Sequence, residues 1–105
     1  MGIKPNGTEG KDWAAQRVLL KNGAEVQITA TNTTINAVQH NASRVVLKIN
    51  DQVVGDTTAD ADRATLTYGL SGDGEFDVVA LCYNEHAEAH SCALTIKKDN
   101  VLVFD

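Results

Sequence analysis

The sequence lacks any apolar run of the roughly 18 residues that a membrane-spanning helix needs. It has no cluster of basic residues larger than Lys97-Lys98, and its 14 acidic residues outnumber the 9 basic ones. Because phosphate binding requires a basic face, this charge balance argues against a nucleic-acid partner. The first residues also lack the charged and then apolar pattern of a secretory signal. We therefore expect neither membrane insertion nor nucleic-acid binding.

Aromatic residues and proline are scarce as well, with five aromatic residues and one proline in the whole chain. Valine and isoleucine together number 16 and threonine 10, and these residue types favour strands. A length of 105 residues suffices for one domain with its own core. Because the chain starts at Met1 and carries no leader pattern, we expect a complete small protein.

Short alternating segments separated by turn signals recur about every ten residues, which predicts an all-β protein. The clearest strand is 75–84, which is apolar on both faces as in the centre of a sheet and follows the glycine turn 71–74. Tight turns are expected at Asn22-Gly23 and Asn50-Asp51. The spacing indicates an antiparallel sandwich or barrel of about seven to eight strands. The other strands are expected at 16–21, 24–31, 44–50, 52–55, 63–70, 89–97 and 101–104.

Residues 85–89 are expected to join strands 75–84 and 89–97 in a hairpin. A hairpin centred on Ala87 places Cys82 directly opposite Cys92, at a distance that a disulfide tolerates. The alternative is a pair of reduced thiols that face inward as small hydrophobic side chains. The sequence leaves both states of the cysteines open.

The same region contains four potential zinc ligands, Cys82, His86, His90 and Cys92, in the pattern C-x3-H-x3-H-x-C. Structural zinc sites favour a close cysteine pair, whereas here the cysteines bracket the histidines, and the hairpin would place His86 at its tip. We therefore expect a solvated loop whose histidines titrate near neutral pH, and no metal.

No catalytic set is apparent. Ser91 lies between His90 and Cys92, but neighbouring residues of a strand point to opposite faces, so a Ser91-His90 pair is poorly placed. The acidic residues Asp60 and Asp62 do not match a calcium-binding loop, and no glycine-rich phosphate loop occurs. We expect a protein that is not an enzyme and that binds no cofactor.

Three segments carry a resemblance to a known family. Residues Gly74 to Cys82 resemble the penultimate strand of immunoglobulin-like domains, and Cys92 to Ile96 resemble the last strand. Residues Val46 to Gly55 are similar to the third strand and turn of bacterial and phage immunoglobulin-like modules. Phe76 stands where a tyrosine corner would need tyrosine, and the second strand has no cysteine, so the antibody type is not expected. The resemblance covers about residues 16–98 and implies an immunoglobulin-like antiparallel β-sandwich.

The resemblance also carries expectations about domains and function. We expect an extended N-terminal arm at 1–13 and the sandwich domain at 14–105. Modules of this kind commonly decorate phage heads and tails or form repeats in bacterial surface proteins. The chain is thus expected to be a structural or interaction module of a phage virion, a head-decoration or tail-accessory protein that binds capsid or tail proteins. The alternative is a cell-surface adhesion or carbohydrate-binding module of a secreted bacterial protein.

Candidate docking residues lie near both ends of the chain. Trp13, at the base of the arm, is expected either to anchor the chain on a partner or to cap its own core. The strand 101–104 could add to the sheet edge of a partner or extend the same sandwich, and a homo-oligomer is a further expectation. The candidate docking residues are Ile3, Pro5, Trp13, Val101, Val103 and Phe104.

Overall fold

The computed structural model describes residues 4–5, 13–35, 42–84, 90–98 and 101–102. Every regular element in these ranges is a strand, so the predicted all-β class is confirmed. No helix within the described ranges could span a membrane. The strands are β1 (Lys4–Pro5), β2 (Trp13–Thr34), β3 (Ser43–Ile49), β4 (Gln52–Ala59), β5 (Arg63–Asn84), β6 (His90–Lys98) and β7 (Val101–Leu102).

These strands form one antiparallel sheet in the order β4-β3-β5-β2-β6-β7, and β1 also pairs with β5. The two longest strands, β2 and β5, have 22 residues each. They pair along nearly their whole length, from Trp13 opposite Leu81 to Thr33 opposite Arg63. The fold is therefore built on one long two-stranded ribbon.

This ribbon bends where both strands contain residues with positive φ angles. These residues are Asn22 (φ 58°), Gly23 (71°), Gly72 (148°) and Gly74 (117°). The tight turn predicted at Asn22-Gly23 is wrong, because these residues lie within the continuous strand β2 and the segments on either side of them do not pair with each other. Each pairs instead with one half of β5, because the glycines of β5 allow that strand to bend at the same point.

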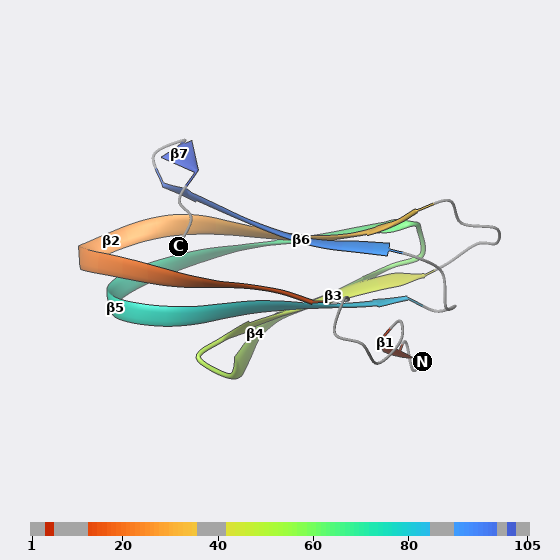
Figure 1. The fold of residues 1–105 in the computed structure, drawn as a ribbon, viewed down its shortest axis with the longest axis horizontal. Helices are drawn as coiled ribbons and strands as arrows, with labels where there is room; N and C mark the ends of the chain where they lie inside the picture. The colour runs from red at the N-terminus through yellow and green to blue at the C-terminus, as the bar shows by residue number, and fades with distance from the viewer. Residues whose placement is uncertain (1–3, 6–12, 36–41, 85–89, 99–100, 103–105) are drawn as a thin grey trace.

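The bend folds the sheet into two facing layers (Figure 1). The first layer contains β4, β3, residues 74–84 of β5 and residues 13–20 of β2. The second layer contains residues 63–72 of β5, residues 24–34 of β2, then β6 and β7. The arrangement is that of a β-sandwich in which two strands run through both layers.

The core lies between the layers and is formed by alternate residues of each strand. The layers approach closely where a Cβ added to Gly55 of β4 would lie 2.7 Å from Leu66 Cδ1 of β5. The buried residues of the core are Val18, Leu20, Val26, Ile28, Ala30, Val45, Leu47, Ile49, Ala64, Leu66, Leu70, Val78, Ala80, Cys82 and Ile96.

The predicted hairpin between β5 and β6 is wrong, because the two strands do not pair. β6 lies in the second layer and pairs with β2, from His90 opposite Thr34 to Lys97 opposite Gln27. Local alternation is the same in either arrangement, so it could not reveal that β6 belongs to the other layer. Pairing with β2 buries Ile96 in the core, where it is 1% exposed.

Other expected boundaries also change. The strands predicted at 63–70 and 75–84 are two halves of β5, and the strand predicted at 52–55 continues to Ala59. The turn predicted at Asn50-Asp51 is confirmed, with φ angles of 50° and 70°.

The two ends of the chain join different layers. In β1, part of the expected arm, Pro5 lies opposite Tyr83 of β5. In β7, Val101 lies opposite Lys98 of β6, so this part of the predicted strand 101–104 belongs to the same sheet.

Candidate functional site

The outer side of the first layer carries the surface that we consider the candidate site. Directly opposite residues of antiparallel strands share one side of the sheet. One row on this side crosses β2, β5 and β3 through Trp13, Leu81 and Val46. The next row consists of Ala15, Val79 and Lys48 on the same three strands. We call this surface the Trp13 face, defined by Trp13, Ala15, Val46, Lys48, Val79 and Leu81.

Trp13 is the most prominent side chain of this face and is 49% exposed. It points away from the space between the layers, so it does not cap the core. Leu81 and Val79 beside it are half-buried, and Val46 is buried. The middle of the Trp13 face is thus apolar although it lies on the outside of the sandwich.

A groove of about 880 Å³ opens along this face. Ala15 and Val79, opposite one another on β2 and β5, are small residues between the larger Leu81 and Arg17. The volume is within the usual range for ligand sites. The groove is lined by Ala15, Gln16, Arg17, Lys48, Asn50, Asp51, Asp77, Val78, Val79 and Leu81.

The rim of the groove is charged but internally paired. Arg17 Nε lies 3.1 Å from Asp77 Oδ1, and Lys48 Nζ lies 3.9 Å from Asp51 Oδ1. The β3–β4 turn is fixed to β5 by two hydrogen bonds of 2.9 Å, in which Asp77 N donates to Asn50 Oδ1 and Asn50 N donates to Asp77 O. The groove therefore combines an apolar centre with a rim whose charges balance.

A third ion pair lies on the same side of the first layer. Arg44 donates two hydrogen bonds to Asp56, from Nε to Oδ1 (2.9 Å) and from Nη2 to Oδ2 (2.7 Å). Its Cζ also lies 5.3 Å from the centre of the Tyr83 ring. The hydrogen bond from Arg44 lowers the pKa of Asp56 and raises the pKa of Arg44, so the pair remains charged at neutral pH.

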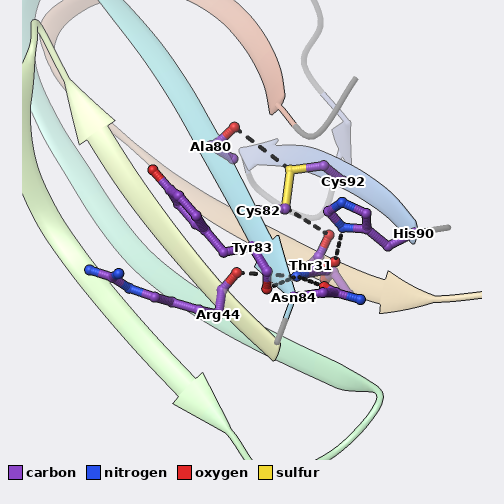
Figure 2. Close-up of a disulfide and its surroundings, with 9 residues drawn as sticks. Thr31, Arg44, Ala80, Cys82, Tyr83, Asn84, His90 and Cys92 are labelled. Atoms are coloured by element: carbon purple, nitrogen blue, oxygen red, sulfur yellow. Dashed lines mark hydrogen bonds between the residues drawn. A yellow bond between two sulfur atoms is a disulfide. The ribbon is translucent and has the colours of Figure 1, made fainter. Parts of the chain in front are cut away.

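Figure 2 shows a disulfide that links the two layers, from Cys82 of β5 to Cys92 of β6. The S–S distance is 2.05 Å and the Cα–Cα distance is 5.7 Å. The sequence predicted that the two cysteines lie opposite one another in a hairpin, and this is wrong. Cys92 lies opposite Asn32 of β2, and the bond crosses the interior. Its position ties β6 to the first layer.

A buried polar cluster lies beside the disulfide and is centred on Asn32, which is 0% exposed. Asn32 Nδ2 donates to Arg44 O (3.1 Å) and Tyr83 O (3.0 Å), which belong to the first layer. It also lies 2.9 Å from Asn84 Oδ1, to which it donates. An amide of β2 in the second layer thus holds carbonyl groups of the opposite layer.

His90, which is labelled in Figure 2, and Thr34 complete this cluster. Asn84 Nδ2 donates to Thr34 Oγ1 over 2.7 Å, and His90 Nδ1 lies 2.7 Å from Asn32 Oδ1. Because Asn32 Nδ2 faces three acceptors, Asn32 Oδ1 must accept, and His90 Nδ1 carries the hydrogen. The hydrogen bonds of this cluster connect the two layers.

The residues expected as weak metal ligands do not form a site in the described part of the chain. The sulfur atoms of Cys82 and Cys92 are bonded to each other, and His90 Nδ1 donates to Asn32. His86 lies outside the described residues. Among those that are described, no three His, Cys, Asp or Glu side chains converge as metal ligands would.

The candidate docking residues are spread over both layers. Pro5 and Trp13 belong to strands that both pair with β5 in the first layer, whereas Val101 belongs to the second layer. Ile3, Val103 and Phe104 lie outside the described residues.

Sequence reasoning missed the outward apolar residues Val46, Val79 and Leu81. The signal was present, because strand 75–84 is apolar on both faces. It was interpreted as a strand buried on both sides, whereas one of its apolar faces forms the Trp13 face.

No protein-family model matches this chain, and no curated protein matches its sequence.

Proposed function

We propose that this chain is a non-enzymatic interaction module that attaches to a larger protein assembly through the Trp13 face. The observation that carries the proposal is Trp13, which is 49% exposed beside a groove with an apolar centre and a charged rim. Tryptophan is enriched among residues that dominate protein–protein binding. An apolar centre enclosed by a polar rim is also the usual composition of such interfaces.

The charges at the groove favour a protein surface over a strongly charged ligand. Arg17 is paired with Asp77, and Lys48 faces Asp51. A phosphate or a polyanion would have to compete with the acidic partner of each cation. A protein surface gains instead from burying Trp13 and Leu81, while the ion pairs remain at the solvated rim.

An immunoglobulin-like topology belongs to the proposal. It is supported by the two antiparallel layers and by the segments that resemble the third, penultimate and last strands. The structure departs from the immunoglobulin topology in the pairing of its strand β6. In immunoglobulin domains the last strand joins the sheet of the penultimate strand, whereas here β6 pairs with β2.

The proposed assembly is a phage virion, in which the chain would be a head-decoration or tail-accessory protein bound to capsid or tail proteins. The strand resemblance supports this choice. The alternative is an extracellular adhesion or carbohydrate-binding module.

Cosedimentation of the purified chain with virion particles from its source tests the proposal. We expect saturable, stoichiometric binding that Trp13→Ala weakens by about thirtyfold, the effect of losing a residue worth about 2 kcal/mol. Leu19→Ala is the matched control, because Leu19 is 57% exposed on the same layer but lies outside the Trp13 face. It should leave binding unchanged.

Absence of binding to the particles would exclude the virion assignment. A glycan array would then test the alternative of a carbohydrate-binding module. Equal binding by the Trp13→Ala variant and the unmodified chain would exclude the Trp13 face as the attachment surface.

A further inference from the structure

The pairing of the described strands leaves four stretches at sheet edges. They are β4, residues 90–96 of β6, residues 13–20 of β2 and residues 63–72 of β5, and the two-residue strand β7 pairs with β6 at Lys97 and Lys98. Edge strands commonly carry cationic side chains, which discourage the addition of another strand. Two of the four edges do so, through Arg17 in β2 and Arg63 in β5.

β4 contains no Lys, Arg or Pro, and unlike residues 90–96 of β6 it belongs to the layer that carries the Trp13 face. Its one charged residue, Asp56, is bound by Arg44 through two hydrogen bonds. Val53 is 57% exposed and lies opposite Lys48, so β4 continues the Trp13 face to the edge of the layer. The one charge of this edge is therefore balanced by an ion pair, and the edge adjoins the proposed attachment surface.

Both ends of this edge are acidic. Asp51 precedes β4, and its side chain is 96% exposed. Asp60 and Asp62 follow β4 and are also exposed. The backbone of this second turn is fixed, because Thr34 N donates to Asp62 O and Ser43 Oγ donates to Ala61 O, each over 2.7 Å. The acidic groups thus flank the edge at defined positions.

We propose that β4 accepts an extended segment of the partner as an added strand, and that this segment is uncharged in its middle and carries Lys or Arg at its ends. The inference rests on the proposed function and specifies the chemistry of the partner. Strand addition uses backbone hydrogen bonds for affinity and side chains for specificity. The basic ends follow from charge complementarity with Asp51, Asp60 and Asp62.

A second copy of this chain fits the edge less well. Antiparallel pairing of β4 with its own copy would bring Asp51 of one molecule toward Asp60 of the other at both ends. Like charges placed opposite one another in a sheet are destabilising. The charge pattern therefore favours a different, basic segment over self-association.

A synthetic peptide provides the test. It alternates threonine and valine over the length of β4 and has two lysines at each end. We expect saturable binding to the purified chain and slower amide hydrogen exchange in β4. A peptide with glutamates at its ends should bind at least about tenfold more weakly, as should one with a central proline, which cannot donate to the ladder.

Charge variants test whether the acidic residues at the ends of β4 contribute to binding of the lysine peptide. The double variant Asp51→Asn with Asp62→Asn should weaken binding of the lysine peptide by about fivefold. Glu25→Gln with Glu75→Gln removes the same charge from exposed positions elsewhere and should have no effect beyond the change in net charge. Asn at position 51 also tolerates the positive φ angle of that turn.

Three outcomes would overturn the inference: no protection of β4 amides, equal binding of the lysine and glutamate peptides, or self-association of the chain through β4. The last would identify a second copy as the occupant. None of these measurements uses virion particles or Trp13, so failure here leaves the test of the proposed function intact.

Discussion

Asn32 shows how a single buried side chain can join two layers of a sheet. Its amide donates to the carbonyl oxygens of Arg44 and Tyr83 in the first layer while its own strand belongs to the second. Replacement by a residue without an amide would leave these buried acceptors without this donor. A cost of about 1–3 kcal/mol is typical for each buried group that loses its partner.

We therefore expect Asn32→Ala to lower the free energy of unfolding by about 2 kcal/mol or more, measured by urea titration. Thr33→Ala, at the neighbouring position on the outer side of β2, should change it by less than about 0.5 kcal/mol. Similar losses in the two variants would show that the amide bonds do not stabilise the fold beyond ordinary packing.

The Arg44–Asp56 pair makes a pH-dependent contribution. Because the pKa of Asp56 is lowered in the folded state, the pair stabilises the fold above the ordinary carboxyl pKa of 3.8, and this contribution is lost as the pH falls through the lowered pKa. Both side chains are partly exposed, so the contribution is at most about 1 kcal/mol.

Urea titrations across the acid range test this expectation. Asp56→Asn should be less stable than the unmodified chain at neutral pH, and the difference should shrink below pH 3.8. About 1 M NaCl should also reduce it by screening. A difference that stays constant with pH would indicate that the substitution acts through packing rather than charge.

Among the strands, the alternation of apolar and polar residues identified most segments but not where each strand begins and ends. Residues 75–84 were predicted as a strand and form one half of β5. The signal could not show that β5 also includes 63–70, because the turn at 71–74 suggested a separate strand. In the structure the glycines bend the strand without ending it, since β2 remains paired on both sides of the bend.

The contact between β4 and β5 across the layers gives a prediction at the scale of strands. A methyl group at position 55 would meet Leu66, which is buried, with its nearest carbon at 2.7 Å. We expect Gly55→Ala to destabilise the fold by about 1–3 kcal/mol through overpacking, measured by thermal and urea unfolding.

Gly69→Ala is the matched control, because the nearest atom to an added Cβ there is Glu25 Oε2 at 3.5 Å, an ordinary contact. It should be neutral or slightly stabilising. Equal destabilisation by both substitutions would argue against the close approach of the two layers at Gly55.

At the scale of the whole molecule, the disulfide joins strands that the sheet separates. Cys82 and Cys92 are 10 residues apart in sequence, and the bond connects the first layer to the second. Closing a loop of this size stabilises a protein by about 2–3 kcal/mol. The bond therefore contributes a sizeable part of the stability of a small domain.

We expect reduction by dithiothreitol to lower the free energy of unfolding by about 2–3 kcal/mol. The double variant Cys82→Ala with Cys92→Ala should show a similar loss and should no longer respond to the reductant. An unmodified chain that is insensitive to reductant would show that the disulfide does not form in solution.

The amino-acid pattern alone predicted the strand character of most segments and the turn at Asn50-Asp51, and it marked Asn22-Gly23, where β2 bends, as a place where the chain changes direction. These properties depend on neighbouring residues, through alternation and through the φ angles that glycine and asparagine tolerate. Trp13 was also singled out from the sequence as a residue of interest.

Which strands pair is seen only once the whole fold is known. β6 presents the same alternation to either β5 or β2, and its place beside β2 follows from the burial of Ile96 and the crossing of the chain between layers. The Trp13 face and the edge at β4 depend on the same long-range choices. Pairing brings together residues far apart in the chain, and periodicity within one segment contains no information about its neighbour.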